Sequence, residues 1–323
     1  MTVSRVINGE GNVRPATQLL VRDSIQALHF VPNAAAKTLA GGEIIRIGLL
    51  CSFPNATFVS EFLIGALERC SQVNAQLIVK RHSPTDDYEA AAAMLIAAGL
   101  DGAILPPPAG DAEELVERLR AAGIAVIATG SIRQGTDLPS IGIDDFAAAR
   151  AMTAHLVSLG HRRIGFISGR PNHASTRLRL DGHRAALADA GIEADEGLIA
   201  AGTYTYHSGL DAAELLLARD PAPTAIFASN DDMAAAAVAV AHRRGLDVPA
   251  DLSVCGFDDT PLATTIWPEL TTVRQPVAVI SEEAVSMLAD IIRRGGGAPG
   301  PVPHRLLDFE LIRRQSDAPP RRL

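Results

Sequence analysis

Short apolar runs alternate with longer helical stretches along most of this 323-residue chain. The apolar runs predict strands at 45–50, 75–80, 102–106, 125–129, 163–168, 225–229 and 252–257. The stretches beside them predict helices at 59–73, 86–98, 111–122, 146–159, 178–190, 208–219, 233–244 and 277–293. Because short apolar strands that alternate with helices form parallel sheets covered on both faces, the pattern indicates an α/β fold.

The predicted strands are too many for one sheet of ordinary size, and the pattern restarts near Asp144 after the loop 130–140. We therefore expect two similar, doubly wound parallel-sheet subdomains. Open parallel sheets bind ligands at the carboxyl ends of their strands, so two facing sheets would form a cleft at a hinge. After a Pro/Gly-rich loop at 293–303, the alternating run 306–314 predicts one last strand.

Composition excludes several classes of protein. Hydrophobic residues make up 47% of the chain and charged residues 20%, which is typical of a packed globular protein. No apolar run reaches the length of a membrane span, and no signal peptide is recognisable, so we expect a cytoplasmic protein. No Cys/His spacing indicates a metal site. The three cysteines are scattered in apolar settings, which favours a reducing compartment: Cys51, Cys70 and Cys255.

Motifs of the common enzyme classes are absent from the sequence. There is no G-x-S-x-G nucleophile elbow, no G-x-x-x-x-G-K-[ST] phosphate loop and no dinucleotide fingerprint opening the first helix of the α/β region. The glycine run at 295–297 lies in a proline-containing loop rather than between a strand and a helix. We therefore expect a binding protein without catalytic residues or cofactor.

The N-terminal segment has a different character. Helices are predicted over 2–7, 15–30 and 34–39, each too small to bury a core of its own. Residues 1–46 carry five basic and three acidic side chains, a net charge of +2, while the whole chain carries −8 and the remainder therefore −10. A mildly basic head on an acidic body is typical of a protein that contacts DNA through one end.

Several motifs strongly resemble the lactose-repressor (LacI/GalR) family of transcriptional regulators. They are TVSRVING (2–9), HFVPNAAAKTL (29–39), LGHRRIGFISG (159–169), STRLRLDGHRAAL (175–187), ASNDDMA (228–234), GLDVPADLSVCGFDD (245–259) and PELTTVRQP (268–276). They occur in the family's order and span nearly the whole chain. The resemblance implies a helix-turn-helix head, a hinge helix and a two-lobed core of the type I periplasmic-binding-protein kind, with three crossings of the chain between lobes.

On this resemblance the chain divides into three parts. Residues 1–31 are a partial helix-turn-helix headpiece, residues 32–43 the hinge helix and linker, and residues 44–323 the effector-binding and dimerisation domain. Within the last part, lobe 1 comprises about 44–143 plus 275–303, and lobe 2 about 144–274 plus 304–315.

The resemblance also implies DNA contacts in the head. Thr2 and Ser4 match hydroxyls that meet phosphate, and Arg5 matches a position that can reach a guanine edge. The chain begins inside the recognition helix, so its helix-turn-helix is truncated. Either the start codon is assigned too late, which we favour, or the chain lacks half its head. The alternative to DNA contact is that these residues merely begin a capping helix.

Of the two expected DNA-binding elements, the hinge helix matches the family more specifically than the partial helix-turn-helix does. Leu39 matches the family's leucine wedge, which enters the minor groove and unstacks a central base step. Ala36 and its alanine neighbours are small enough for a narrow groove, Asn33 can cap the helix and Lys37 can meet phosphate. A linker helix without a role in DNA binding is the alternative.

Seven residues are candidates for the effector site, because the resemblance places them at strand and loop ends: Phe58, His173, Ser175, Arg179, Tyr204, Asn230 and Asp258. Arg179 offers a planar fork of donors and Asp258 an acceptor pair, while Tyr204 could stack on a ligand ring. Alternatives remain for several of them. Arg179 and Asp258 could form a structural ion pair across the cleft, Asn230 could cap the next helix, Tyr204 could be ordinary packing and His173 plain surface. We expect His161 to order a helix end rather than touch ligand.

The sequence therefore predicts a sequence-specific transcriptional regulator, most simply a repressor, controlled by a sugar, a sugar acid or a purine bound between two lobes. Its partners would be operator DNA, with the protein on the nucleoid when bound, and a second copy in a homodimer. A tetramer is not expected, since no heptad repeat follows residue 314. A stand-alone solute-binding sensor without DNA binding is the rival.

Overall fold

The computed structural model describes residues 6, 13–27, 44–51, 56–82, 87–131, 137–295 and 302–321. The chain divides into two units, Met1–Ile44 and Ile45–Leu323. In the first unit, helix α2 (Pro15–Ala27) begins at a proline, whose fixed φ angle and missing N–H suit the first turn of a helix. All seven predicted DNA-contact residues (Thr2, Ser4, Arg5, Asn33, Ala36, Lys37 and Leu39) lie outside the described residues.

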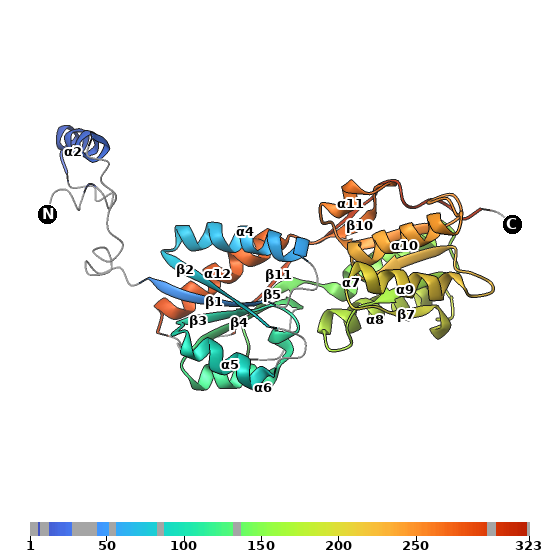
Figure 1. The fold of residues 1–323 in the computed structure, drawn as a ribbon, viewed down its shortest axis with the longest axis horizontal. Coiled ribbons are helices and arrows are strands. Elements are labelled where there is room, and N and C mark those ends of the chain that lie inside the picture. The colour runs from blue at the N-terminus through green and yellow to red at the C-terminus, as the bar shows by residue number, and fades with distance from the viewer. Residues whose placement is uncertain are drawn as a thin grey trace. The chain divides into compact units, whose positions relative to one another are not determined.

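The second unit contains two six-stranded sheets, each covered by helices on both faces (Figure 1). The first sheet has the strand order β11-β5-β4-β3-β1-β2, and all its strands are parallel. Its strands are β1 (Ile45–Cys51), β2 (Ala75–Arg81), β3 (Gly102–Leu105), β4 (Ala125–Ser131), β5 (Ser140–Ile143) and β11 (His304–Leu307). One face packs on α4 (Ala56–Gln72) and α12 (Val277–Arg293), the other on α5 (Tyr88–Ala97) and α6 (Glu113–Ala121).

The second sheet repeats this plan with the order β12-β10-β9-β8-β6-β7, and its one antiparallel pair in the described residues is β10 with β12. Its strands are β6 (Ile164–Ser168), β7 (Ile199–Ala201), β8 (Ala225–Ala228), β9 (Ser253–Asp258), β10 (Thr271–Arg274) and β12 (Glu310–Ile312). Helices α7 (Asp145–Ser158) and α8 (Ala174–Asp189) cover one face, and α9 (Tyr206–Leu217) and α10 (Asp231–Arg243) cover the other. The predicted fold class, two doubly wound subdomains, is confirmed.

The chain passes between the two lobes three times: between β5 and α7, between β10 and α12, and between β11 and β12. This arrangement corrects two expectations. The run 306–314 is not one strand, and residues 304–307 do not belong to the second lobe, because β11 continues the first sheet beside β5. Only β12 pairs with the second sheet. An alternating pattern reports that residues form a strand, but it carries no information about which sheet that strand joins.

Three strands were not predicted because they are short or polar: β5, β7 and β10. Strand β10 has the sequence TTVR, and its two threonines are fully buried. Their hydroxyls donate to Asp317 and Asp231, so buried acceptors from elsewhere in the fold satisfy the polar groups of this strand. Among the described residues, no helix is both long and apolar enough to cross a membrane.

Candidate ligand-binding site

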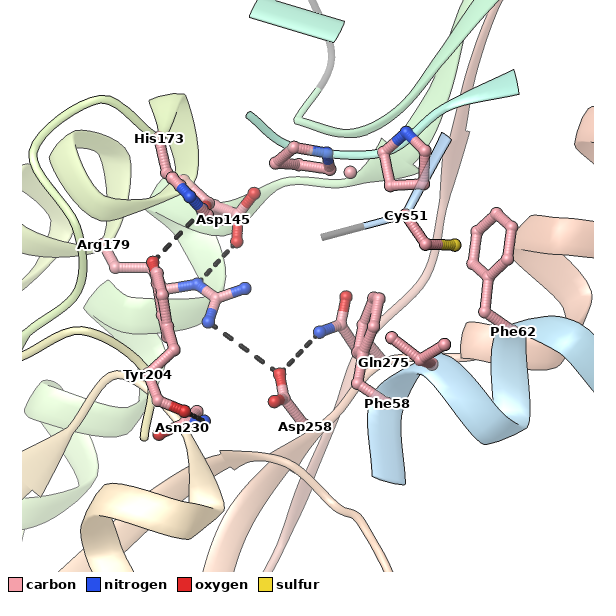
Figure 2. A pocket seen from close by; sticks show the side chains of 15 residues that line it. Cys51, Phe58, Phe62, Asp145, His173, Arg179, Tyr204, Asn230, Asp258 and Gln275 are labelled. Atoms are coloured by element: carbon pink, nitrogen blue, oxygen red, sulfur yellow. Dashed lines mark hydrogen bonds and ion pairs between the residues drawn. The ribbon is translucent and has the colours of Figure 1, made fainter. Parts of the chain in front are cut away.

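A cavity of about 850 Å³, including the part open to solvent, lies between the two lobes (Figure 2). Its lining includes all seven residues predicted for the effector site: Phe58, His173, Ser175, Arg179, Tyr204, Asn230 and Asp258. Eight further residues line it that the sequence analysis did not name: Cys51, Val59, Phe62, Pro106, Pro107, Gly130, Asp145 and Gln275.

Three of the polar lining residues stand at or just after the carboxyl end of a strand. Asp145 is the first residue of α7, directly after β5, and Asn230 caps α10 directly after β8. Asp258 is the last residue of β9. Strands β8 and β9 are parallel neighbours in the second sheet, so Asn230 and Asp258 reach the same edge of it. Asp145 follows β5 of the first sheet, at the crossing into the second lobe.

Arg179 is the central charged group of the cavity. It is 5% exposed, and its Nε donates to Asp145 Oδ1 at 2.7 Å while one of its terminal nitrogens donates to the Ser229 carbonyl at 2.6 Å. Its guanidinium carbon lies 3.5 Å from the centre of the Phe257 ring, a cation–π contact. Burial alone would lower the pKa of Arg179, but the charges of Asp145, Tyr204 and Asp258 raise it above its ordinary value. Arg179 is therefore a fixed cation.

The structure differs from the alternative in which Arg179 and Asp258 form an ion pair across the cleft. The two groups are 3.8 Å apart, a looser contact than that of Arg179 with Asp145. Both carboxylates belong to the second lobe, as Arg179 does, so these pairs stiffen one wall and leave the two lobes unbridged. Asp145 was not predicted, because the short strand β5 that precedes it lacks a recognisable pattern in the sequence.

Asp258 connects the cavity to a crossing between the lobes. Gln275, which follows β10 on the way to α12, donates from Nε2 to Asp258 Oδ1 at 2.6 Å. Burial raises the pKa of Asp258 to about 7, although Arg179 and the Gln275 hydrogen bond both act to lower it. Asp258 and Asp259 have φ angles of 110° and 59°, a left-handed conformation that non-glycine residues adopt only where their surroundings hold them.

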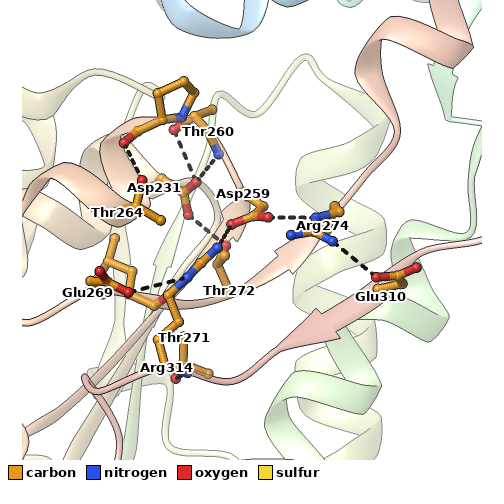
Figure 3. Close-up of polar contacts among 12 residues, drawn as sticks. Asp231, Asp259, Thr260, Thr264, Glu269, Thr271, Thr272, Arg274, Glu310 and Arg314 are labelled. Atoms are coloured by element: carbon orange, nitrogen blue, oxygen red, sulfur yellow. Dashed lines mark hydrogen bonds and ion pairs between the residues drawn. The ribbon is translucent and has the colours of Figure 1, made fainter.

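Several polar contacts hold this strained turn in place (Figure 3). Asp259 accepts from Arg274 Nε at 2.7 Å, and Arg274 also pairs with Glu310 at 3.3 Å. Arg314 lies 2.6 Å from the other oxygen of Asp259. Since Arg274 and Glu310 stand at two of the three crossings, the loop that carries Asp258 is tied to the hinge.

The rings of Tyr204 and His173 pack against each other at the other side of the cavity, with centroids 5.3 Å apart and planes tilted by 33°. The Tyr204 hydroxyl shares a 2.7 Å hydrogen bond with Thr176 and a longer one with Ser175. The His173 Nε2 atom is buried and has no hydrogen-bond partner among the described residues. Burial lowers the pKa of His173 to about 4, so the imidazole is neutral near pH 7 and can offer a hydrogen bond to a ligand.

Asn230 combines the two roles that the sequence left as alternatives. Its Oδ1 accepts from the Met233 backbone N–H at 3.1 Å, which caps α10. Its Nδ2 donates to the Tyr204 carbonyl at 3.1 Å. The same side chain lines the cavity, so Asn230 both caps α10 and forms part of the cavity wall.

His161 lies away from the cavity in a buried polar network of the second lobe. Its ring nitrogens hydrogen-bond to Thr224, Ser253 and the Ala318 carbonyl at 2.8–3.1 Å. It therefore helps to fix the C-terminal segment on the second sheet. In the parts of the chain that the structure describes, no group of three or more His, Cys, Asp or Glu side chains could hold a metal ion.

The first-lobe wall was the hardest part of the cavity to predict. Phe58, Val59 and Phe62 lie on α4, and Pro106 and Pro107 follow β3. A proline pair after a predicted strand is a usable signal, since ligands approach strand ends. Nothing in the sequence distinguishes Val59 or Phe62 from the other apolar residues of an amphipathic helix.

Comparison with known proteins gives concordant matches. Residues 153–316 match the family described as "Periplasmic binding protein-like domain". Catabolite control protein A of Priestia megaterium is 34% identical over 298 residues, covering 91% of this chain and 89% of that protein. The HTH-type transcriptional regulator CelR of Thermobifida fusca is 33% identical over 325 residues, covering 98% of this chain and 94% of that protein.

Two solved structures resemble the whole chain. The lac repressor dimer bound to operator and the anti-inducer ONPF has a TM-score of 0.78 at 28% identity, covering 98% of this chain and 94% of that chain. The complex of the transcriptional regulator CelR with cellobiose has a TM-score of 0.76 at 31% identity, covering 97% and 94%.

Proposed function

The chain belongs to the LacI/GalR family of transcriptional regulators, and from this we propose that it is a repressor whose binding to operator DNA is controlled by a sugar-type effector. Three of the relatives that cover most of its length are named HTH-type transcriptional regulators, which favours DNA binding over a stand-alone sensor and over an enzyme. Solved neighbours carry cellobiose in one case and operator DNA in another.

One observation carries the proposed control by ligand: the cavity is lined from both lobes at the point where the chain crosses between them. A ligand that contacts both walls favours the lobe angle at which those contacts are best. Gln275, at the crossing between β10 and α12, donates a hydrogen bond to Asp258, so a ligand that contacts Asp258 binds next to that crossing. A coupling of about 1–3 kcal/mol would change DNA affinity about 5–150-fold, which is enough for a switch.

The proposed DNA contacts rest on the sequence resemblance. We assign phosphate and base contacts to Thr2, Ser4, Arg5, Asn33, Ala36 and Lys37, and the minor-groove wedge to Leu39. We also propose that the protein acts in the cytoplasm as a homodimer, because two hinge helices side by side suit a near-palindromic operator. Its lobe angle would then set the spacing of the two leucines.

The test uses the full chain and labelled promoter fragments from the neighbourhood of its gene, with anisotropy measured at two salt concentrations. We expect specific binding that weakens with salt, because phosphate contacts release counterions. Leu39→Ala should reduce specific affinity strongly, whereas Leu67→Ala, at an exposed leucine of α4, should not. Thermal-shift screening with sugars, sugar acids and purines would identify ligands for the second stage.

In the second stage, a ligand that stabilises the protein should change its operator affinity at least fivefold. Salt-insensitive binding, or binding that is equal on all fragments with and without each stabilising ligand, would overturn the proposal. A protein that binds a sugar yet no promoter fragment would support the solute-binding alternative instead.

A further inference from the structure

A hydrogen bond joins the two lobes beside the cavity. The carboxylate of Asp111 belongs to the first lobe, in the 3-10 helix η1 (Ala109–Asp111) that follows β3. Its Oδ2 accepts from the backbone N–H of Ala174, the first residue of α8 in the second lobe, at 3.1 Å. Neither residue lies on a crossing of the chain, so the covalent chain does not hold these two surfaces together. The contact breaks when the lobes move apart at this point.

The N-terminus of α8 obtains a cap from the other lobe. The first backbone N–H groups of a helix have no partner within the helix. His173 directly precedes α8, but its side chain makes no capping hydrogen bond to a described residue. The Asp111 carboxylate supplies an acceptor instead, and its negative charge lies at the positive end of the helix dipole. A helix of the second lobe is therefore stabilised by a side chain of the first lobe.

The contact stands between the two walls of the cavity. In the first lobe, Pro106 and Pro107 line the cavity shortly before η1 begins. In the second lobe, His173 and Ser175 line it on either side of the donor residue. A movement of α8 away from η1 would therefore separate the two walls that a ligand has to contact together.

The acceptor is held firmly on the first sheet. The backbone N–H of Asp111 donates to the Pro108 carbonyl at 3.0 Å. A Cβ atom at Gly110 would lie 2.7 Å from the Leu105 carbonyl oxygen, so η1 packs directly against the end of β3. A group that is already fixed loses little conformational entropy when it forms a contact. The position of η1 therefore sets where α8 finds its cap.

We infer that Asp111 is an interlobe capping residue, which favours the lobe angle of this structure before any ligand binds. Asp111 is not among the described residues that line the cavity, so it is a positioning residue that acts through α8. A ligand that contacts both walls at this angle binds a conformation that Asp111 already populates, and its apparent affinity rises with that population. The effect on operator DNA rests on the proposed function, whereas the effect on the lobe angle does not.

Spin labels on the full chain measure the lobe angle. Glu117→Cys on α6 and Ala188→Cys on α8 place one label on the exposed surface of each lobe, and the three native cysteines are buried. Double electron–electron resonance gives the distances between the labels, and singly labelled proteins report the distances between two copies. Without ligand, we expect Asp111→Ala to shift the interlobe distances to longer values. Asp111→Asn keeps the shape and one acceptor oxygen, so it should shift them less in the same direction.

The matched control removes the same kind of bond inside one lobe. Asp195 Oδ1 accepts from the Gly197 backbone N–H at 2.8 Å, and both residues belong to the second lobe. Asp195→Ala should leave the interlobe distances of the natural protein unchanged. A loss of stability alone would affect both variants, whereas a change of lobe angle should appear only at Asp111.

Calorimetry and operator anisotropy give two further readouts. The probes are glucose, galactose, ribose, cellobiose and adenine. For any probe that binds the natural protein, Asp111→Ala should lower the affinity about threefold or more, and Asp195→Ala should not change it. Without a probe, Asp111→Ala should change operator affinity in the direction opposite to the change that the bound probe causes, because the variant loses the angle that the probe favours.

The outcomes separate this inference from the function. Interlobe distances that are the same in Asp111→Ala as in the natural protein would overturn the inference, and so would an equal shift in Asp195→Ala. An unchanged affinity for a probe that binds the natural protein would also overturn it. If no probe binds, the distances alone decide. If the lobes separate in Asp111→Ala while no protein binds any promoter fragment, the inference stands and the proposed repressor function fails.

Discussion

The buried pair of Arg179 and Asp145 gives a stability prediction that can be worked from the structure. The Asp145 carboxylate is 2% exposed and the Arg179 side chain 6%, with 2.7 Å between their nearest atoms. Arg179→Met keeps most of the side-chain volume but removes the charge that Asp145 pairs with. Breaking one side of a buried ion pair costs about 3–5 kcal/mol, a large part of the roughly 5–15 kcal/mol that stabilises a typical protein.

The second variant separates charge from packing. In Arg179→Met combined with Asp145→Leu, neither charge remains, and apolar side chains of similar volume often replace a buried pair at little cost. We expect this double variant to regain most of the lost stability, to within about 1–2 kcal/mol of the natural protein. The measurement is urea unfolding followed by circular dichroism, which gives the free energy of unfolding of each variant.

A surface pair provides the matched control. Arg150 lies 2.7 Å from Asp189, with side chains 54% and 56% exposed. Arg150→Met should cost no more than about 1 kcal/mol, because water screens exposed pairs. The reasoning is refuted if Arg179→Met is no more destabilising than Arg150→Met, or if the double variant is as unstable as the sum of its two single changes.

Three further predictions concern the cavity. Gly169→Ala would place a Cβ 2.0 Å from the Tyr204 ring, so the ring must move and calorimetry should show ligand affinity reduced about tenfold or more. Because burial raises the pKa of Asp258 from 3.8 to about 7, the native state holds that proton more tightly than the unfolded state, and stability falls as the pH rises from about 4 to 7. In Asp258→Asn, the free energy of unfolding measured with urea should differ less between pH 5 and pH 8 than in the natural protein. An equal difference in the two proteins would contradict this prediction. Gln275→Leu removes the hydrogen bond that links the crossing to Asp258, so at ligand concentrations that saturate the variant, the ligand should change operator anisotropy less than in the natural protein.

Local patterns predicted most of the elements of the two lobes, and the reason is physical. A buried strand or an amphipathic helix is specified by the spacing of its own apolar residues, so α12 was predicted with the bounds it has in the structure, Val277–Arg293. Strand β10 was missed because its buried threonines depend on acceptors contributed by distant Asp231 and Asp317. No local pattern encodes such a partner.

The candidate site shows the same difference between what local sequence predicts and what tertiary contacts decide. Asp258, Asn230 and Arg179 stand near motifs whose order the sequence displays, and they were named in advance. Asp145 and Gln275 lie at crossings between the lobes, and although Gln275 belongs to the motif at 268–276, the part that each plays in the cavity depends on what it contacts.

The sequence by itself determined that this chain forms alternating strands and helices, because hydrophobic periodicity is a property of neighbouring residues. Its motifs were also enough to identify the family. Tertiary structure decided which sheet each strand joins, sending β11 to the first lobe and β12 to the second. It also decided that, among the described residues, the side chains lining the cavity from the first lobe are apolar apart from the Cys51 thiol, whereas the second lobe contributes the paired charges of Arg179 and Asp145. Those properties depend on distances between residues far apart in sequence, and only the packed chain fixes such distances.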